Sequence, residues 1–91
     1  MYKIYKYRIS SIENVNIIPL PKDALILYAD RDNKDGYWYM WVQFKIENET
    51  NLVERKFSLI PTGAPFGDVS MYYISTIQTG PFVYHLFEYS K

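Results

Sequence analysis

The sequence YYISTIQTGPFVYHLFEY, residues 72–89, predicts two β-strands, Tyr72–Gln78 and Phe82–Tyr89, joined by a turn at Thr79-Gly80-Pro81. Aromatic and β-branched residues, which favour strands, fill both halves, and glycine followed by proline is typical of a turn. The second half also holds His85, the only histidine of the chain. This segment therefore predicts an aromatic-rich β-hairpin.

Five more segments have the composition of strands. The clearest is Tyr37–Ile46, whose side chains alternate in character with the period of two that a strand requires. A run with two prolines, Val15–Pro21, belongs at an edge or in an extended crossover, because proline donates no ladder hydrogen bond. The five segments are 2–9, 15–20, 24–29, 37–46 and 53–60. The chain is therefore predicted to be all-β, a small antiparallel sandwich or barrel of six to seven strands, with at most one short helical turn, at Asp68–Tyr73.

Length, charge and composition narrow the possible functions. Ninety-one residues predict a single domain over 1–91, and ten basic and ten acidic residues cancel. A neutral chain has no net field to attract duplex DNA or an anionic membrane, so neither is an expected partner. The absence of cysteine removes disulfides, thiolate catalysis and most structural zinc sites. With no visible secretory signal and no apolar run near about 18 residues, a cytosolic location is expected.

An acidic loop, residues 30–36, offers oxygen ligands of the kind that calcium prefers. Its spacing does not fit an EF-hand, because placing Gly36 at the glycine position of that loop puts Val42 where the bidentate acid belongs. We expect a solvated hairpin loop and no metal site.

The excess of tyrosine over phenylalanine suggests that some rings face a ligand, although core and sheet-surface packing explains most aromatic residues equally well. Rings at alternate positions of 37–46 share a face and suit stacking. A loop at 61–67 offers a hydroxyl and backbone donors for an anionic group, and its alternative role is a turn that needs glycine. The candidate ligand-binding residues are Tyr37, Tyr39, Trp41, Thr62, Gly63, His85 and Arg8.

Other roles remain open for some of these residues. His85 is the simplest general acid or base for a small hydrolase or nuclease, but a structural role is more common for a lone histidine, and no catalytic constellation accompanies it. Basic residues interleaved with tyrosines in Tyr2–Arg8 also suit a strip that stacks single-stranded nucleic acid. An ordinary amphipathic strand explains the same alternation of basic residues and tyrosines equally well.

The chain resembles a family of small uncharacterised proteins encoded mostly by bacteriophages and prophages. The matching segments are Ile4-Tyr5-Lys6-Tyr7, Leu20-Pro21-Lys22-Asp23-Ala24, Ile26-Leu27, Pro61-Thr62-Gly63-Ala64-Pro65, Tyr73–Gln78 and Phe82–Glu88. Four positions depart from the family pattern: Asp23, Pro61 and Ser75 replace glycines, and Tyr84 replaces a tryptophan. The resemblance implies a viral accessory protein and supplies no active site to transfer.

Together these observations predict a non-catalytic binding protein without a cofactor, encoded by a phage and acting in the host cytoplasm. As a counter-defence protein it would sequester a nucleotide-type immune signal. The alternative is an inhibitor that covers a host defence enzyme. A homo-oligomer is expected, because so aromatic a short chain tends to expose an apolar patch.

Overall fold

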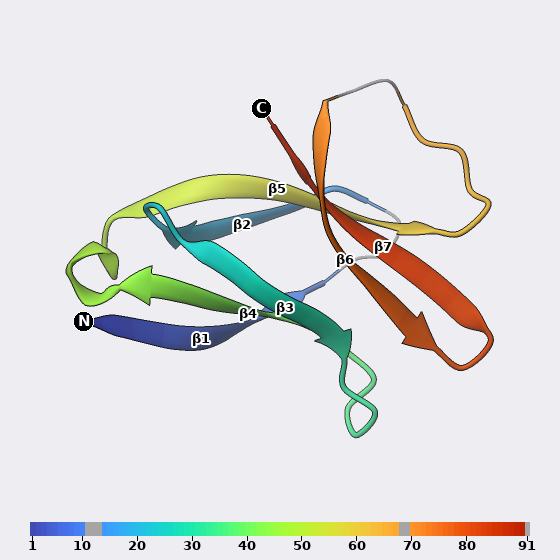
Figure 1. The fold of residues 1–91 in the computed structure, drawn as a ribbon, viewed down its shortest axis with the longest axis horizontal. Helices are drawn as coiled ribbons and strands as arrows, with labels where there is room; N and C mark the ends of the chain where they lie inside the picture. Colours follow the sequence, from blue (N-terminus) through green and yellow to red (C-terminus); the bar gives the residue numbers. More distant parts are fainter. Residues whose placement is uncertain (11–13, 68–69, 91) are drawn as a thin grey trace.

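The computed structural model describes residues 1–10, 14–67 and 70–90. These residues form seven strands, which confirms the predicted all-β class (Figure 1). The strands are β1 (Tyr2–Ile9), β2 (Asn16–Pro21), β3 (Leu25–Arg31), β4 (Trp38–Lys45), β5 (Leu52–Pro61), β6 (Met71–Thr79) and β7 (Phe82–Tyr89). Each lies within about two residues of a predicted segment.

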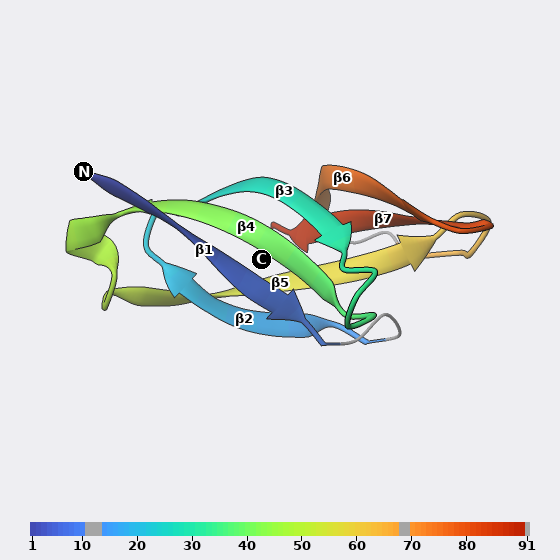
Figure 2. The ribbon, with the colours of Figure 1, turned by 90° about the horizontal axis from the view of Figure 1, so that it is seen from below.

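Two antiparallel sheets make up the fold, one with the order β1-β4-β3 and the other with the order β2-β5-β7-β6. Figure 2 shows the three-stranded sheet lying over the four-stranded one. The sheets face each other because alternate residues of β4, β5 and β7 are apolar and need cover from water. The chain is thus an antiparallel sandwich whose two outer faces point in opposite directions.

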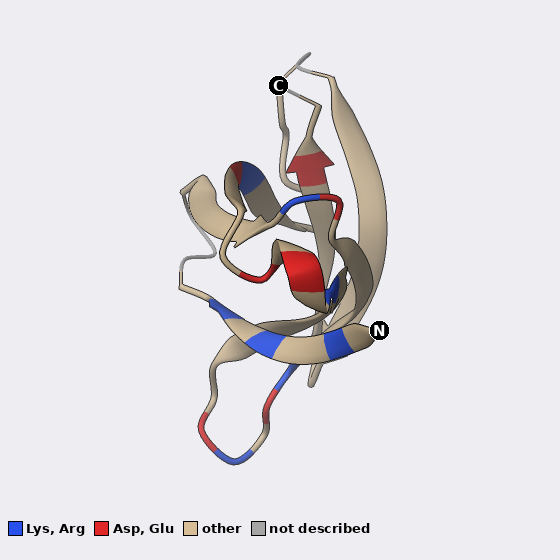
Figure 3. Cartoon of the chain, turned by 90° about the vertical axis from the view of Figure 1, so that its left-hand side faces the viewer, with Lys and Arg blue, Asp and Glu red and all other residues tan. Residues whose placement is uncertain are grey.

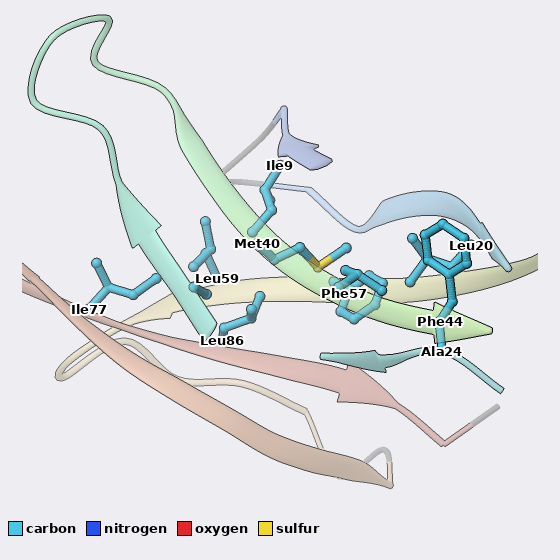
Figure 4. Packing of buried hydrophobic residues seen from close by; sticks show 11 residues of the cluster. Ile9, Leu20, Ala24, Met40, Phe44, Phe57, Leu59, Ile77 and Leu86 are labelled. Atoms are coloured by element: carbon cyan, nitrogen blue, oxygen red, sulfur yellow. The ribbon is translucent and has the colours of Figure 1, made fainter. Parts of the chain in front are cut away.

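The core lies between the sheets (Figure 4). In β4 the buried side chains are Met40, Val42 and Phe44, as the alternation predicts, and all three are at most 1% exposed. Phe57 and Leu86 meet them from the other sheet and are fully buried. Removing these side chains from water provides most of the stabilisation of so small a sandwich.

Two further contacts tie the sheets together. Trp38 of β4 packs edge-on against Tyr84 of β7, with ring centroids 4.8 Å apart. Arg55 of β5 donates to both carboxylate oxygens of Glu88, one of them at 2.7 Å, and also to the carbonyl of Ala24 at 2.6 Å, just before β3. A pair of aromatic rings and a partly buried arginine, itself ion-paired to Glu88, therefore link the two sheets on their inner side.

β2 lies at the edge of its sheet, which confirms the position predicted from its prolines. It pairs with β5 only over Leu52–Phe57, whereas β7 pairs with β5 over Phe57–Pro61. Phe57 is the one residue of β5 that pairs on both sides. The four-stranded sheet is therefore staggered along β5.

β-Bulges interrupt two strands. The register shifts between Ile26 and Tyr28 in β3, and between Tyr73 and Ser75 in β6. Each bulge inserts one residue, so side chains three positions apart point to the same face where regular alternation would separate them. Both bulges affect the candidate sites described below.

The predicted helical turn at 68–73 is wrong over Met71–Tyr73, which belong to β6, because pairing of Met71 with Tyr89 extends the hairpin ladder. Asp68 and Val69 lie outside the described residues. The one helical element among the described residues is a 3₁₀ turn, Ile46–Asn48, closed by a bond from Glu49 N to Ile46 O of 3.0 Å. None of the described helical residues forms a helix long and apolar enough to cross a membrane.

The acidic loop is a hairpin loop, as predicted. Asp32 accepts a bond from the backbone nitrogen of Lys34, and Asp35 accepts one from that of Tyr37, each at 2.8 Å. Gly36 takes a φ of 78°, which favours glycine. The carboxylates of this loop are thus occupied in shaping the turn, and no group of three or more metal-ligating side chains occurs among the described residues.

Asp23 adopts a φ of 61° in the β2–β3 turn, the only described non-glycine residue with a positive φ. Aspartate tolerates the left-handed region better than most side chains, which allows it at this position of the turn.

Candidate functional site

The seven candidate residues divide into two groups on opposite sides of the sandwich. Tyr37, Tyr39, Trp41 and Arg8 lie on the outer side of the three-stranded sheet, because their buried neighbours Met40, Val42 and Ile9 point inward. The other three candidates, Thr62, Gly63 and His85, lie at the outer side of the four-stranded sheet, where His85 alternates with buried Leu86. The predicted single site is therefore two separate places.

On the outer side of the three-stranded sheet, the strand register places residues of β1 and β3 beside the outward residues of β4. Trp41 pairs with Lys6 of β1 and with Tyr28 of β3, and the next outward residue, Tyr39, pairs with Arg8 and Asp30. Tyr37 follows at the end of the row. We call Lys6, Arg8, Tyr28, Tyr37, Tyr39 and Trp41 the cation–aromatic face.

The two cations lie over the rings of this face. Lys6 Nζ is 4.0 Å from the ring centroid of Tyr39 and 5.7 Å from that of Trp41. The guanidinium carbon of Arg8 is 3.6 Å from the ring centroid of Tyr37. Figure 3 shows basic residues distributed along the strand that begins at the N mark. Cations over aromatic rings are attracted by the negative ring faces, which fixes their positions.

Among the described residues only Lys6 of these two cations lies within ion-pair distance of a carboxylate, while Arg8 acts on Asp35 at longer range and helps to lower its pKa. Lys6 Nζ lies 3.5 Å from Asp32 Oδ2, whereas none of the ion pairs among the described residues includes Arg8. Arg8 is exposed. Its guanidinium therefore keeps its hydrogen-bond donors for water or for an anionic ligand.

Asp35 accepts a hydrogen bond from the hydroxyl of Tyr39 at 2.7 Å. This bond lowers the pKa of Asp35, with help from the backbone of Tyr37, and raises the pKa of Tyr39. Tyr28 likewise donates to Asp30 at 3.0 Å, and that bond raises the pKa of Tyr28. The rings of Tyr28 and Tyr39 are thus held by their hydroxyl ends.

Tyr28 was missed as a site residue by sequence reasoning, which placed it only within the predicted strand 24–29. The bulge at Ile26–Tyr28 turns it outward beside Trp41, with ring centroids 5.7 Å apart. Regular alternation from Leu25 would have pointed Tyr28 into the core. No signal in the sequence marks this bulge.

On the second side, four side chains form a continuous hydrogen-bonded chain. Thr62 Oγ1 lies 2.8 Å from His85 Nε2, and Thr76 Oγ1 lies 3.0 Å from His85 Nδ1. The hydroxyl of Tyr73 lies 2.7 Å from Thr76 Oγ1. We call Tyr73, Thr76, His85 and Thr62 the hydroxyl–histidine chain.

The bonds of this chain can run in either of two directions, and only one direction keeps the bond from the Thr62 hydroxyl to the carbonyl of Val83. In the first, Tyr73 donates to Thr76, Thr76 to Nδ1 of His85, and Nε2–H of His85 to Thr62, whose hydroxyl donates to the carbonyl of Val83 at 3.2 Å. In the second, every bond from Thr62 to Tyr73 runs in the opposite direction, and Thr62 gives up its bond to Val83 because its one hydroxyl hydrogen goes to His85 Nε2. His85 therefore contacts two neutral hydroxyls, and the carboxylate that orients the histidine of a serine protease triad has no counterpart at Nδ1.

Thr62 and Gly63 form a tight turn. The backbone nitrogen of Ala64 donates to the carbonyl of Pro61 at 3.1 Å, and Gly63 takes a φ of 89°. The backbone nitrogen of Thr62 is bound to the carbonyl of Val83 at 2.9 Å, so it is not available to an anion. The turn that the sequence allows as the alternative role of Gly63 is thus present.

Sequence reasoning offered His85 an acid–base role or a structural role, and it missed the partners Thr76 and Tyr73. These two residues are three positions apart, so regular alternation puts them on opposite faces. The bulge at Tyr73–Ser75 brings both to the outer face beside His85 and Phe87. The chain thus depends on an irregularity that the alternation does not reveal.

The strip of basic residues and tyrosines predicted on Tyr2–Arg8 is not one surface. Tyr5 and Tyr7 point to the inner side, where Tyr5 packs edge-on against Phe44 at 5.1 Å and Tyr7 packs against the core. Lys6 and Arg8 point outward. The rings that accompany these cations come from β4 and β3.

These observations define a small antiparallel β-sandwich with two chemically different outer faces. The chain belongs to the DUF7352 family, a domain of unknown function whose model matches residues 1–91. Comparisons with curated proteins and with solved structures found no match.

Proposed function

We propose that this chain is a non-catalytic binding protein that holds a nucleotide-type ligand on the cation–aromatic face. The observation that carries the proposal is the position of Arg8, which is stacked on Tyr37 and forms no ion pair within 4.0 Å among the described residues. An anionic group can bind its donors without displacing an existing ion pair.

The rings beside Arg8 supply the second half of the recognition. Tyr28, Tyr39 and Trp41 are neighbours, with Tyr39 and Trp41 centroids 6.4 Å apart. Nucleobases stack on such rings and on the planes of guanidinium groups, with roughly 1–3 kcal/mol per stacked base in single-strand complexes. A nucleotide joins a flat base to an anionic group, so it can use the rings and Arg8 together.

The acidic residues near the face give it selectivity. Asp30, Asp32 and Asp35 hold Tyr28, Lys6 and Tyr39 in place through the contacts described above. They also repel a polyanion that runs along the whole face. This favours a compact ligand with one anionic end over duplex or long single-stranded nucleic acid.

The proposal is tested by a thermal-shift titration of the purified protein with cyclic dinucleotides, cyclic trinucleotides and ADP-ribose. A ligand that binds only the folded state raises the free energy of unfolding, by about 2.7 kcal/mol at a ligand concentration of a hundred times Kd, and the unfolding midpoint rises with it. We expect a saturable rise with at least one of these compounds. Arg8→Gln and Tyr37→Leu should each abolish most of it.

Matched controls lie on the other sheet. Lys56→Gln removes an exposed cation from β5, and Tyr72→Leu removes a ring from β6 that is 64% exposed. Both should leave the rise unchanged. A flat response to all the nucleotides, or equal loss in the control variants, would contradict the proposal.

The proposed setting is the cytosol of a phage-infected bacterium, where the protein would sequester a nucleotide immune signal as a homo-oligomer. Its support is the resemblance to phage and prophage proteins, together with the lack of a carboxylate partner for His85 among the described residues. Sedimentation at micromolar concentration should show a species larger than the 10.9 kDa chain.

A second candidate function, inhibition of a host defence enzyme, is supported by an apolar patch on the same sheet. Ile4 and Leu25 flank Gln43, and they are 55% and 57% exposed, with Tyr2 59% exposed nearby on β1. Exposed apolar patches of this kind mark protein-binding surfaces. Under this alternative, a stoichiometric host polypeptide is captured by the native protein but not by Ile4→Lys, and nucleotides have no effect on the midpoint.

A further inference from the structure

The outer side of the four-stranded sheet contains a groove that plays no part in the function proposed above. Its volume is about 370 Å³, and it lies between the loop 61–67 and the outer side chains of β5 and β7. Small-molecule sites typically have volumes of about 300–1,000 Å³. The groove is therefore large enough for a small ligand.

The lining of the groove combines apolar and hydroxyl groups. Ile60 and Met71 form its apolar part with Phe66, whose ring stands 5.7 Å from that of Phe87. Ser58 and Tyr89 contribute a hydroxyl pair, with 2.9 Å between the two oxygens. None of the described lining residues is charged. A charged ligand would lose its hydration here without finding an opposite charge.

The polar groups of this side can change roles between donor and acceptor. Either oxygen of the Ser58–Tyr89 pair can donate to the other, and the hydroxyl–histidine chain has the two opposite arrangements described above. Strand register places the two sets next to each other, because Ser58 and Tyr73 both pair with Phe87, and Ile60 and Thr76 both pair with His85. A ligand that both donates and accepts at neighbouring atoms matches such groups.

We propose that this groove is a binding site for an uncharged saccharide unit. A sugar ring has hydroxyls that donate and accept on its edge and a face of C–H groups that packs against apolar and aromatic side chains. In the groove the C–H face would pack under Phe66 and against Ile60, and the hydroxyls would bond with Ser58 and Tyr89. Neutral recognition of this kind needs no cation, in contrast to the cation–aromatic face.

The test is an NMR titration of the ¹⁵N-labelled full chain with glucose, galactose, mannose, N-acetylglucosamine, maltose, cellobiose and lactose. Glucuronate, a sugar ring of the same shape with a carboxylate, is the charged comparison. We expect saturable shifts of the amides of Ser58, Ala64, Phe66 and Tyr89 with at least one neutral sugar and none with glucuronate. Loss of one hydrogen bond in Tyr89→Phe should weaken binding about fivefold.

Tyr72→Phe is the matched control, because it removes a phenol hydroxyl of β6 outside the groove, and it should leave the affinity unchanged. The proposal is overturned if no neutral sugar shifts the groove amides, if glucuronate binds as well as glucose, or if Tyr89→Phe binds as tightly as the native protein. These outcomes are independent of the nucleotide titration, since the two sites lie on opposite sides of the sandwich.

Discussion

The two outer sides of the sandwich are built on the same plan but carry different chemistry. On the three-stranded sheet, the central strand β4 presents Trp41 and Tyr39 between basic residues of β1 and Tyr28 and Asp30 of β3. On the four-stranded sheet, the central strand β7 presents Phe87 and His85 between residues of β5 and β6 that are apolar or bear hydroxyls. One fold thus offers a charged surface around β4 and an uncharged one around β7, while the exposed Lys56 lies further along β5.

The difference shows that side-chain chemistry, and not backbone architecture, divides the roles of the two sides. Both sides depend on a bulge, at Tyr28 in one and at Tyr73–Ser75 in the other, that adds a tyrosine to the outer row. Both rest on the same core, in which Met40 of β4 and Leu86 of β7 are fully buried. A substitution in the core should therefore disturb the structure of both surfaces, whereas a substitution on one surface should disturb that surface alone.

The largest effect is expected from Leu86→Ala, which leaves a cavity beneath both surfaces. Truncation of a buried leucine costs about 2–5 kcal/mol. Urea unfolding should show this loss, and NMR spectra should change on both outer sides. Phe82→Ala, at an exposed position of the same strand, is the control, with a change of under about 1 kcal/mol expected. Spectral changes confined to one side would show that the two surfaces do not share a core.

A smaller effect is expected from His85→Phe, which removes the centre of the hydroxyl–histidine chain. Thr62 and Thr76 are exposed and can bond to water instead, so the cost should stay below about 1.5 kcal/mol. Urea unfolding measures it, and nucleotide binding on the other side should be unchanged. A loss above about 3 kcal/mol would mean that the chain is a structural support and not a surface feature.

The smallest effect is expected on the pKa of Asp35, at acid pH, and it is confined to the cation–aromatic face. The Tyr39 hydroxyl lowers the pKa of Asp35 below its ordinary value of 3.8, so the bond stabilises the fold above about pH 3.8 and is lost as the pH falls through the lowered pKa. In Tyr39→Phe, NMR titration of the Asp35 carboxyl carbon should give a higher midpoint.

Tyr37→Phe is the control for this titration, because Tyr37 bonds to Asp35 through its backbone nitrogen and keeps that bond. An equal midpoint in the native protein and in Tyr39→Phe would contradict the assigned cause of the shift.

Alternation and turn chemistry predicted most of the fold. All seven strand segments are present, the buried residues of β4 follow the predicted alternation, and the prolines of β2 lie at an edge. These features depend on side-chain periodicity and on the backbone N–H that proline lacks, which are local properties of the sequence. The helical turn was misplaced because the pairing partner of Met71 is Tyr89, far from it in the chain.

The candidate sites were predictable only in part. The shared face of Tyr37, Tyr39 and Trp41 follows from alternation within one strand, whereas the contact of Thr62 with His85 needs the register between β5 and β7. Tyr28, Tyr73 and Thr76 were missed because bulges reverse their expected directions. Ligand identity on either face stays a prediction.

The stagger of β5 described above has a consequence for hydrogen exchange. Successive amides of a strand point to opposite edges, and each half of β5 is paired on only one edge: Leu52–Lys56 with β2, and Ser58–Pro61 with β7. Within each half, alternate amides face a partner strand while those between them face away from it. The paired edge of β5 changes sides at Phe57. The slow-exchanging amides should therefore have residue numbers of one parity before Phe57 and of the other parity after it. A change of parity at Phe57 in a hydrogen-exchange measurement would show that the sheet keeps its stagger in solution.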